Sequence, residues 1–110
     1  MEIYRNYINA EWQEGTSGYW EENINPATGE VLGKASFASR EDTRQAIQCA
    51  QEAYKEWRMI PPPERASYLL KAMLLMAERI NTFARNLTLE EGKLFSEAQG
   101  EVKKTLKILE

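Results

Sequence analysis

Residues 25–30, Asn-Pro-Ala-Thr-Gly-Glu, decide how the first part of this chain folds. Pro26 fixes the φ angle needed at the second position of a type I turn, Asn25 can bond the backbone ahead of it, and Gly29 adopts a positive φ at little cost. The residues on either side, 19–24 and 31–35, are extended in character. The stretch therefore predicts a β-hairpin whose two strands meet at this turn.

The residues before the hairpin predict one more strand. Residues 7–12, Tyr-Ile-Asn-Ala-Glu-Trp, have an aromatic and β-branched start and an aromatic end, which favours a short strand. Residues 14–18, Glu-Gly-Thr-Ser-Gly, form a turn-rich connector. We therefore expect an antiparallel set of two or three short strands before Ala38.

The remainder of the chain is helical in pattern. Ser39 is a suitable N-cap for a first helix. That helix ends near Arg58, because the prolines at 61–63 cannot continue it. A second helix opens at Pro63 or Glu64, where proline is tolerated.

Two further helices follow. Asn81-Thr82 predicts a break and a new cap, and the third helix stops at Gly92, where a positive φ costs little. Ser96 with Gln99 predicts a capping box for the fourth helix. The fourth helix runs to Glu110 in full pattern, which indicates that the chain was cut there.

Apolar residues recur at spacings of three and four along these helices and predict buried stripes. The stripes are Ala46, Ile47, Ala50, Ala53, Tyr54 and Trp57; then Ala66, Leu69, Leu70, Met73, Leu74, Ala77 and Ile80; then Val102, Leu106 and Leu109.

Composition bounds the class of protein. The chain has 110 residues, of which 43% are hydrophobic and 28% charged, with a formal net charge of −3. These values fit a water-soluble globular protein of one domain at most and argue against disorder. The small charge gives no reason to expect nucleic acid or an anionic membrane as a partner, since both require a clustered basic face.

The rare residue types exclude several kinds of site. The chain has one cysteine and no histidine, which excludes an internal disulfide, a His-based general base and the usual zinc sites. A reducing cytoplasm is the expected compartment. The first residues contain no apolar signal segment, and no run approaches the ~20 apolar residues of a membrane span.

Each candidate for chemistry has a plainer interpretation. Cys49 lies inside the first helix without a histidine or a nearby helix N-terminus to lower its pKa, so we interpret it as an inert thiol. The paired acids Glu90 and Glu91, and Glu97 and Glu101, fit solvated helix faces better than a cation site.

Neither a phosphate cradle nor a stacking platform is indicated. The glycines are dispersed, and Lys93, although it follows a glycine, lacks the other Walker residues. The aromatic residues are interpreted as core, because no basic patch interleaves with them. They are Trp12, Tyr19, Trp20, Tyr54 and Trp57.

Several pieces taken together resemble a known family. Their order along practically the whole chain is similar to the N-terminal part of an NAD(P)-dependent aldehyde dehydrogenase. The pieces are residues 7–12, residues 25–31, the segment from Ala46 to Trp57, Glu64-Arg65, residues 88–93, Glu97-Ala98 and residues 100–102.

The resemblance implies a fold and a role. It implies an α+β fragment, with short N-terminal strands in residues 1–38 and about four helices in residues 39–110. This single partial domain, residues 1–110, would be the outer part of the α/β cofactor-binding domain. The remainder of the enzyme chain would be its partner, in a homo-oligomer. NAD or NADP would bind the full-length enzyme, and we expect no cofactor on this chain.

The implied reaction is the oxidation of an aldehyde to a carboxylic acid. A thiolate attacks the carbonyl, hydride passes to the nicotinamide, and water hydrolyses the thioester. The residues that do this in the family lie downstream of the region represented here. We therefore predict no catalytic, cofactor-binding or metal residue on this chain. The family's monovalent cation site falls near Ile24 and Glu101, but the acid is one position out of register, and we do not assign the site.

Two hypotheses follow for the function. The first is an N-terminal structural portion of an aldehyde dehydrogenase, inactive alone; the alternative is a free-standing helical interaction module derived from that family. Without the sheet that the helices would cover, the stripe from Leu69 to Leu74 and the stripe from Val102 to Leu109 predict open apolar patches and self-association.

Overall fold

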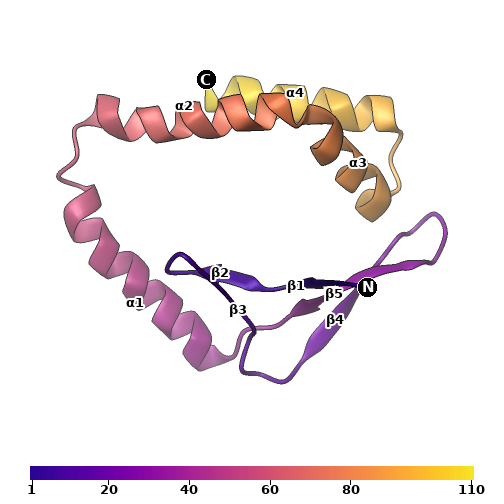
Figure 1. The fold of residues 1–110 in the computed structure, drawn as a ribbon, viewed down its shortest axis with the longest axis horizontal. Helices are drawn as coiled ribbons and strands as arrows, with labels where there is room; N and C mark the ends of the chain where they lie inside the picture. The colour runs from indigo at the N-terminus through magenta and orange to yellow at the C-terminus, as the bar shows by residue number, and fades with distance from the viewer. The chain divides into compact units, whose positions relative to one another are not determined.

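The computed structural model describes residues 1–110, which form two compact units. Unit 1 comprises Met1–Ile24 and Glu30–Met59 and contains the strands and the first helix. Unit 2 comprises Asn25–Gly29 and Ile60–Glu110 and contains the other three helices (Figure 1). The α+β class with four helices is as the sequence predicts.

The predicted hairpin is confirmed. Strand β4 (Trp20–Ile24) pairs antiparallel with β5 (Val31–Ser36), with Trp20 opposite Ser36. At the turn, the Asn25 Oδ1 atom accepts a hydrogen bond from the Ala27 N–H at 2.9 Å, and Asn25 is only 8% exposed. Gly29 has a φ of 75° and donates its N–H to the Asn25 carbonyl at 2.8 Å. Local backbone requirements therefore explain each residue of the turn.

The sheet contains a strand that the sequence did not indicate. Strand β1 (Glu2–Tyr4) pairs parallel with β5, so that the sheet order is β1-β5-β4. The predicted all-antiparallel set is therefore wrong. A strand of three residues is too short to show an alternating pattern, and its partner lies about thirty residues away in the sequence.

The prediction of one strand over residues 7–12 is also wrong. The segment is a second hairpin, in which β2 (Asn6–Ile8) pairs antiparallel with β3 (Glu11–Gln13). Asn9 and Ala10 join the strands with φ angles of 52° and 65°. Two positive φ angles fit the right-handed twist of a two-residue hairpin. Alanine rarely adopts such an angle, so the residue types at positions 9 and 10 do not indicate a turn.

The boundaries predicted for the first helix are confirmed. Helix α1 (Arg40–Trp57) has Ser39 as its N-cap and Arg58 as its C-cap. The Ser39 Oγ atom accepts the Asp42 N–H at 3.0 Å, and the Asp42 carboxylate accepts the Ser39 N–H at 2.8 Å. This reciprocal arrangement is a capping box. The predicted buried stripe of this helix is wrong, because α1 has no buried residue.

Three helices make up most of unit 2. Helix α2 (Pro62–Glu78) begins one residue before the predicted start, and α3 (Ile80–Glu91) ends at Gly92, whose φ is 76° as expected. The break between them lies at Arg79 and not at the predicted Asn81-Thr82. The chain turns without a polar cap there, and this is why the cap pattern misplaced it.

Helix α4 (Phe95–Leu109) begins one residue before Ser96. The predicted Ser96–Gln99 capping box is wrong, because Leu94 is the N-cap and makes no side-chain bond. The Gln99 amide instead donates to the Asn81 side chain at 2.9 Å and so joins α4 to α3. Gln99 therefore makes a contact between two helices and does not cap its own helix.

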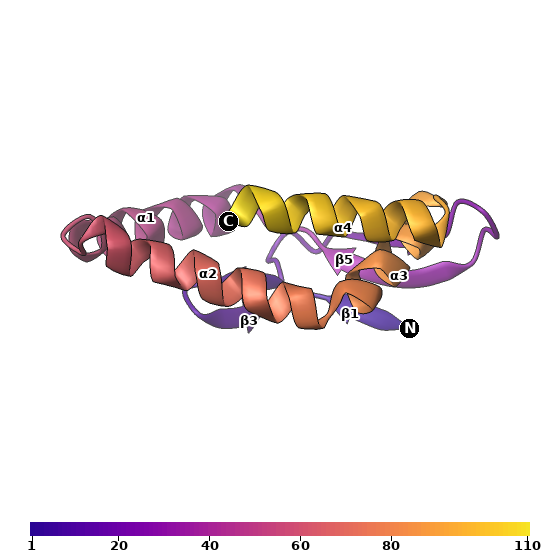
Figure 2. The same cartoon turned by 90° about the horizontal axis from the view of Figure 1, so that it is seen from above.

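The core of unit 2 lies between α3 and α4. Ala84, Ala98 and Val102 are buried there. Small side chains at the contact let the two helices approach closely. Figure 2 shows α2 beside α4. Further residues pack against this core: Met76, Ile80 and Leu87.

The predicted apolar stripes of unit 2 differ in how far their side chains are buried. The stripe with Leu69, Leu70 and Leu74 is open, since each of these side chains is at least half-exposed. The prediction that the last stripe is open is wrong at Val102, which is 5% exposed. None of the four helices combines the length and the apolar character that a membrane crossing requires.

Candidate functional site

The densest group of polar contacts in unit 1 joins the connector before β4 to the start of α1. The Asp42 carboxylate accepts the Thr16 N–H at 2.7 Å, and its other oxygen lies 2.8 Å from the Thr16 hydroxyl. The hydroxyl oxygens of Thr16 and Ser39 are also 2.8 Å apart. We call these three residues, Thr16, Ser39 and Asp42, the clasp.

The hydrogen bonds of the clasp change the acidity of Asp42. The backbone N–H of Thr16, followed by that of Ser39, stabilises the ionised carboxylate and lowers its pKa from 3.8 to about 2. A carboxylate this acidic is a poor general base. The clasp therefore ties the connector to the start of α1.

The connector approaches the end of β5 closely on both sides of the clasp. The Gly15 N–H donates to the Ser36 hydroxyl at 2.6 Å, and the Ser17 hydroxyl donates to the Phe37 carbonyl at 2.6 Å. A Cβ on Gly15 would lie 1.8 Å from the Phe37 carbonyl oxygen, so only glycine fits. The sequence pattern predicts a connector here but does not indicate a role for Thr16, whose partner lies 26 residues away.

In unit 2, a lysine contacts one carboxylate from each of the two predicted acidic pairs. The Lys93 ammonium lies 2.5 Å from the Glu101 carboxylate and 3.6 Å from that of Glu91. The hydrogen bond to Glu101 raises the pKa of Lys93 above its ordinary value. Lys93 thus links the end of α3 to α4 through ion pairs. Glu90, the other acid of the first pair, lines an apolar pocket of about 220 Å³ between the helices.

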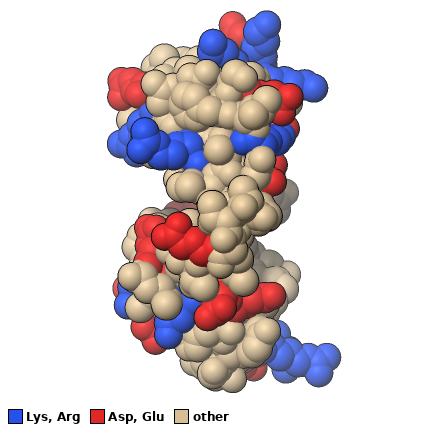
Figure 3. All heavy atoms as spheres, turned by 90° about the vertical axis from the view of Figure 1, so that its right-hand side faces the viewer, with Lys and Arg blue, Asp and Glu red and all other residues tan.

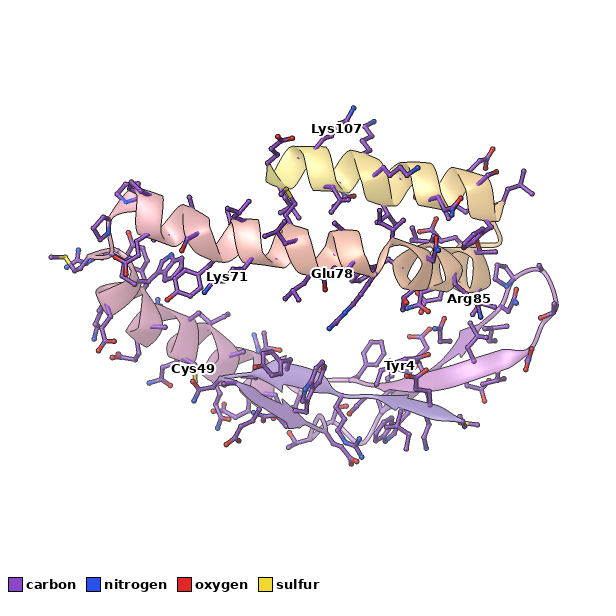
Figure 4. All side chains as sticks on the ribbon, turned by 45° about the horizontal axis from the view of Figure 1, so that its top comes forward. Tyr4, Cys49, Lys71, Glu78, Arg85 and Lys107 are labelled. Carbon is purple, nitrogen blue, oxygen red and sulfur yellow. The ribbon has the colours of Figure 1, made fainter.

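Cys49 lies half-buried on α1, where Figure 4 labels it. It shares a shallow hollow with Asn9, Gln48 and two carboxylates, Glu52 and Glu56. The side chains that line this hollow are neutral or acidic, and none is cationic.

The interpretation of the aromatic residues as core is wrong for most of them. Trp12 is 69% exposed, Tyr54 is 59% exposed, and Tyr19 and Trp57 are also exposed. Trp12 packs against Tyr7, at 4.8 Å between ring centroids, and Trp20 is half-buried with the Lys34 ammonium 4.8 Å from its ring. The rings of Trp12, Tyr19, Tyr54 and Trp57 thus remain exposed in this chain.

The glycines do not fit a dinucleotide. Gly18 and Gly29 have positive φ angles in turns, Gly92 caps α3, and Gly15 contacts the backbone at Phe37. None stands between a strand and the helix that follows it, where backbone amides would hold a pyrophosphate. Turns, a helix cap and one close backbone contact therefore account for these four glycines.

Charged side chains are mixed on the surface. Figure 3 shows the Lys and Arg atoms interspersed with the Asp and Glu atoms on the face it presents.

Comparison with known proteins decides the family. The model of the aldehyde dehydrogenase family matches residues 12–110. The chain belongs to the aldehyde dehydrogenase family. The resemblance recognised in the sequence is therefore confirmed.

Curated relatives in the aldehyde dehydrogenase family are much longer than this chain. It is 43% identical over 110 residues to malonate-semialdehyde dehydrogenase 2 of Geobacillus kaustophilus and covers 23% of that protein. It is 41% identical over 106 residues, 96% of its length, to malonate-semialdehyde dehydrogenase 2 of Oceanobacillus iheyensis and covers 22% of it. The chain thus spans less than a quarter of these relatives.

Solved structures of longer proteins share the fold of this chain. One described as a methylmalonate-semialdehyde dehydrogenase from Sinorhizobium meliloti, complexed with NAD, matches 99% of this chain with a TM-score of 0.92 and 32% identity. An NADP-dependent enzyme of E. coli matches 97% with a TM-score of 0.93 and 34% identity. The chain covers 22% of each of these structures.

Proposed function

We propose that this chain is the N-terminal structural portion of an enzyme that oxidises an aldehyde to a carboxylic acid with NAD or NADP, and that it is inactive alone. One observation carries the proposal: the chain belongs to the family yet spans 23% of the relative in Geobacillus kaustophilus. The remainder of the enzyme chain would supply the thiolate, the general base and the dinucleotide site.

This chain would contribute a structural part of the enzyme and no catalytic residue. The clasp holds the connector on α1, and Lys93 holds α3 to α4. The apolar sides of α1 and α2 remain exposed, with Tyr54 and Leu69 each more than half-exposed. Exposed apolar faces of this extent mark interaction surfaces. We propose that the rest of the enzyme covers part of them.

The relatives suggest a substrate class for the longer enzyme. The curated relatives are named for malonate semialdehyde, and one solved relative is named for methylmalonate semialdehyde. We therefore propose a short semialdehyde, in which a carboxylate accompanies the aldehyde. One solved relative is complexed with NAD and another is named NADP-dependent, so the proposal includes both cofactors.

Compartment and assembly belong to the same proposal. We place the longer enzyme in the cytoplasm, in a homo-oligomer. The single cysteine fits a reducing compartment, because it can form no disulfide within the chain. The exposed apolar faces fit an assembly in which they are covered.

Nucleotide binding by the purified chain tests the structural role. We expect isothermal titration with NAD⁺ or NADP⁺ to give no heat of binding at millimolar nucleotide, because no glycine-rich cradle is present. A longer family member, such as the Geobacillus kaustophilus relative, serves as the positive control. Saturable binding to the 110-residue chain would contradict the proposal.

A further inference from the structure

Helix α2 has an inward and an outward side. Met73, Met76 and Ile80 are partly buried, and Met76 and Ile80 pack against the core of unit 2. With 3.6 residues per turn, these positions define one side of the helix, and residues 71, 74, 75 and 78 lie on the opposite side. The packing of α2 thus fixes which residues face outward.

The outward side combines two leucines with two opposite charges. Leu74 is 53% exposed and Leu75 is 50% exposed, and Lys71 and Glu78 are exposed as well. Figure 4 shows Lys71 and Glu78 on the side of α2 turned away from α4. We call Lys71, Leu74, Leu75 and Glu78 the α2 face.

The α2 face is complementary to itself when two copies are antiparallel. Its midpoint lies between Leu74 and Leu75, and Lys71 and Glu78 are equally far from that midpoint, about 5 Å along the axis. A twofold axis at the midpoint brings Lys71 opposite Glu78 of the second copy, and the reverse pair forms as well. Each leucine meets its own counterpart.

The parallel arrangement is disfavoured by the same charges. It would bring Lys71 opposite Lys71 and Glu78 opposite Glu78, and like charges across a helix contact are destabilising. The antiparallel arrangement exchanges both repulsive contacts for attractive ones. Charge complementarity therefore favours a second copy of this chain in the antiparallel orientation.

We propose that two copies of this chain associate through the α2 face, antiparallel, with the leucine pairs at the centre and a Lys71–Glu78 ion pair at each end. The contact area is small compared with the ~1,600 Å² of a standard protein interface, so the dimer is weak and depends on concentration. The inference concerns the 110-residue chain and does not rest on the proposed enzymatic role.

Charge exchange tests the proposal. Sedimentation velocity of the full 110-residue chain is measured from about 10 μM to 1 mM, a range that covers weak dimers. The variants are Lys71→Glu, which creates two Glu–Glu contacts, and the double variant Lys71→Glu with Glu78→Lys, which restores two opposite-charge contacts. Lys107→Glu on the exposed surface of α4, labelled in Figure 4, is the control with the same change in net charge.

The proposal predicts a reversible dimer that Lys71→Glu weakens about tenfold, that the double variant restores to within about twofold, and that Lys107→Glu leaves unchanged. Circular dichroism verifies that each variant is helical. A monomer throughout the concentration range would overturn the proposal. So would equal effects of Lys71→Glu and Lys107→Glu, or failure of the double variant to restore the dimer.

Discussion

At the residue scale, Gly15 is the position where the backbone tolerates least. Gly15→Ala places a Cβ 1.8 Å from the Phe37 carbonyl oxygen, so the connector must move away from β5. We expect a loss of about 1–3 kcal/mol in the free energy of unfolding of unit 1, as for other overpacked sites. Urea denaturation measures it. Gly100→Ala, in helix α4 with nothing within 4 Å, is the control and should stabilise slightly.

Asp42 gives unit 1 a pH dependence of defined sign. Its pKa is about 2 in the folded chain and 3.8 as the ordinary value, so the unfolded chain binds more protons in between. The stabilisation is present above pH 4 and is lost as the pH falls toward 2. Asp42→Asn should show a smaller loss of melting temperature from pH 4 to pH 2 than the original chain. Equal losses in both proteins would contradict the clasp.

Residues whose roles are local could be predicted from the sequence. Ser39 as an N-cap and Gly29 and Gly92 at positive φ were predicted correctly, because each satisfies a requirement of its immediate neighbours. Thr16 could not be found, since its partners lie 23 and 26 residues away. Gln99 was misassigned for the same reason, because a distant Asn81 is its partner.

At the scale of elements, length decided which could be predicted. The hairpin of β4 and β5 and the four helices were predicted, because each gives several residues of periodic pattern between clear turn signals. Strands β1, β2 and β3 have three residues each, which is too few for a period. The second hairpin also lacked a glycine at its turn, where Asn9 and Ala10 take positive φ angles.

Packing between α3 and α4 should hold unit 2 together. Val102→Ala removes two methyl groups from a side chain that is 5% exposed, and we expect a loss of about 2 kcal/mol in stability. Ile108→Ala on the same helix, where the side chain is 76% exposed, should change stability by less than about 0.5 kcal/mol. Thermal unfolding followed at 222 nm, the usual helix signal, compares the two. Equal effects would show that Val102 is not in a core.

At the scale of the whole molecule, the pattern of burial explains why a valid periodicity rule predicted buried helix faces that are exposed in this chain. Amphipathic periodicity shows which side of a helix is apolar but not whether that side is covered in this chain. Helix α1 has no buried residue and the outward side of α2 is exposed, whereas Val102 is buried between α3 and α4. The absence of any assigned site residue stays a prediction, as does the single partial domain.

Reconstitution of activity tests the central claim most directly. The 110-residue chain is co-expressed with the Geobacillus kaustophilus relative from which the matching N-terminal 110 residues are removed, and aldehyde-dependent formation of NADH or NADPH is measured. Malonate semialdehyde, after which that relative is named, is the substrate. The account predicts no activity from either part alone and measurable activity from the two together. Turnover by the 110-residue chain alone, or full activity of the truncated relative without it, would contradict the account.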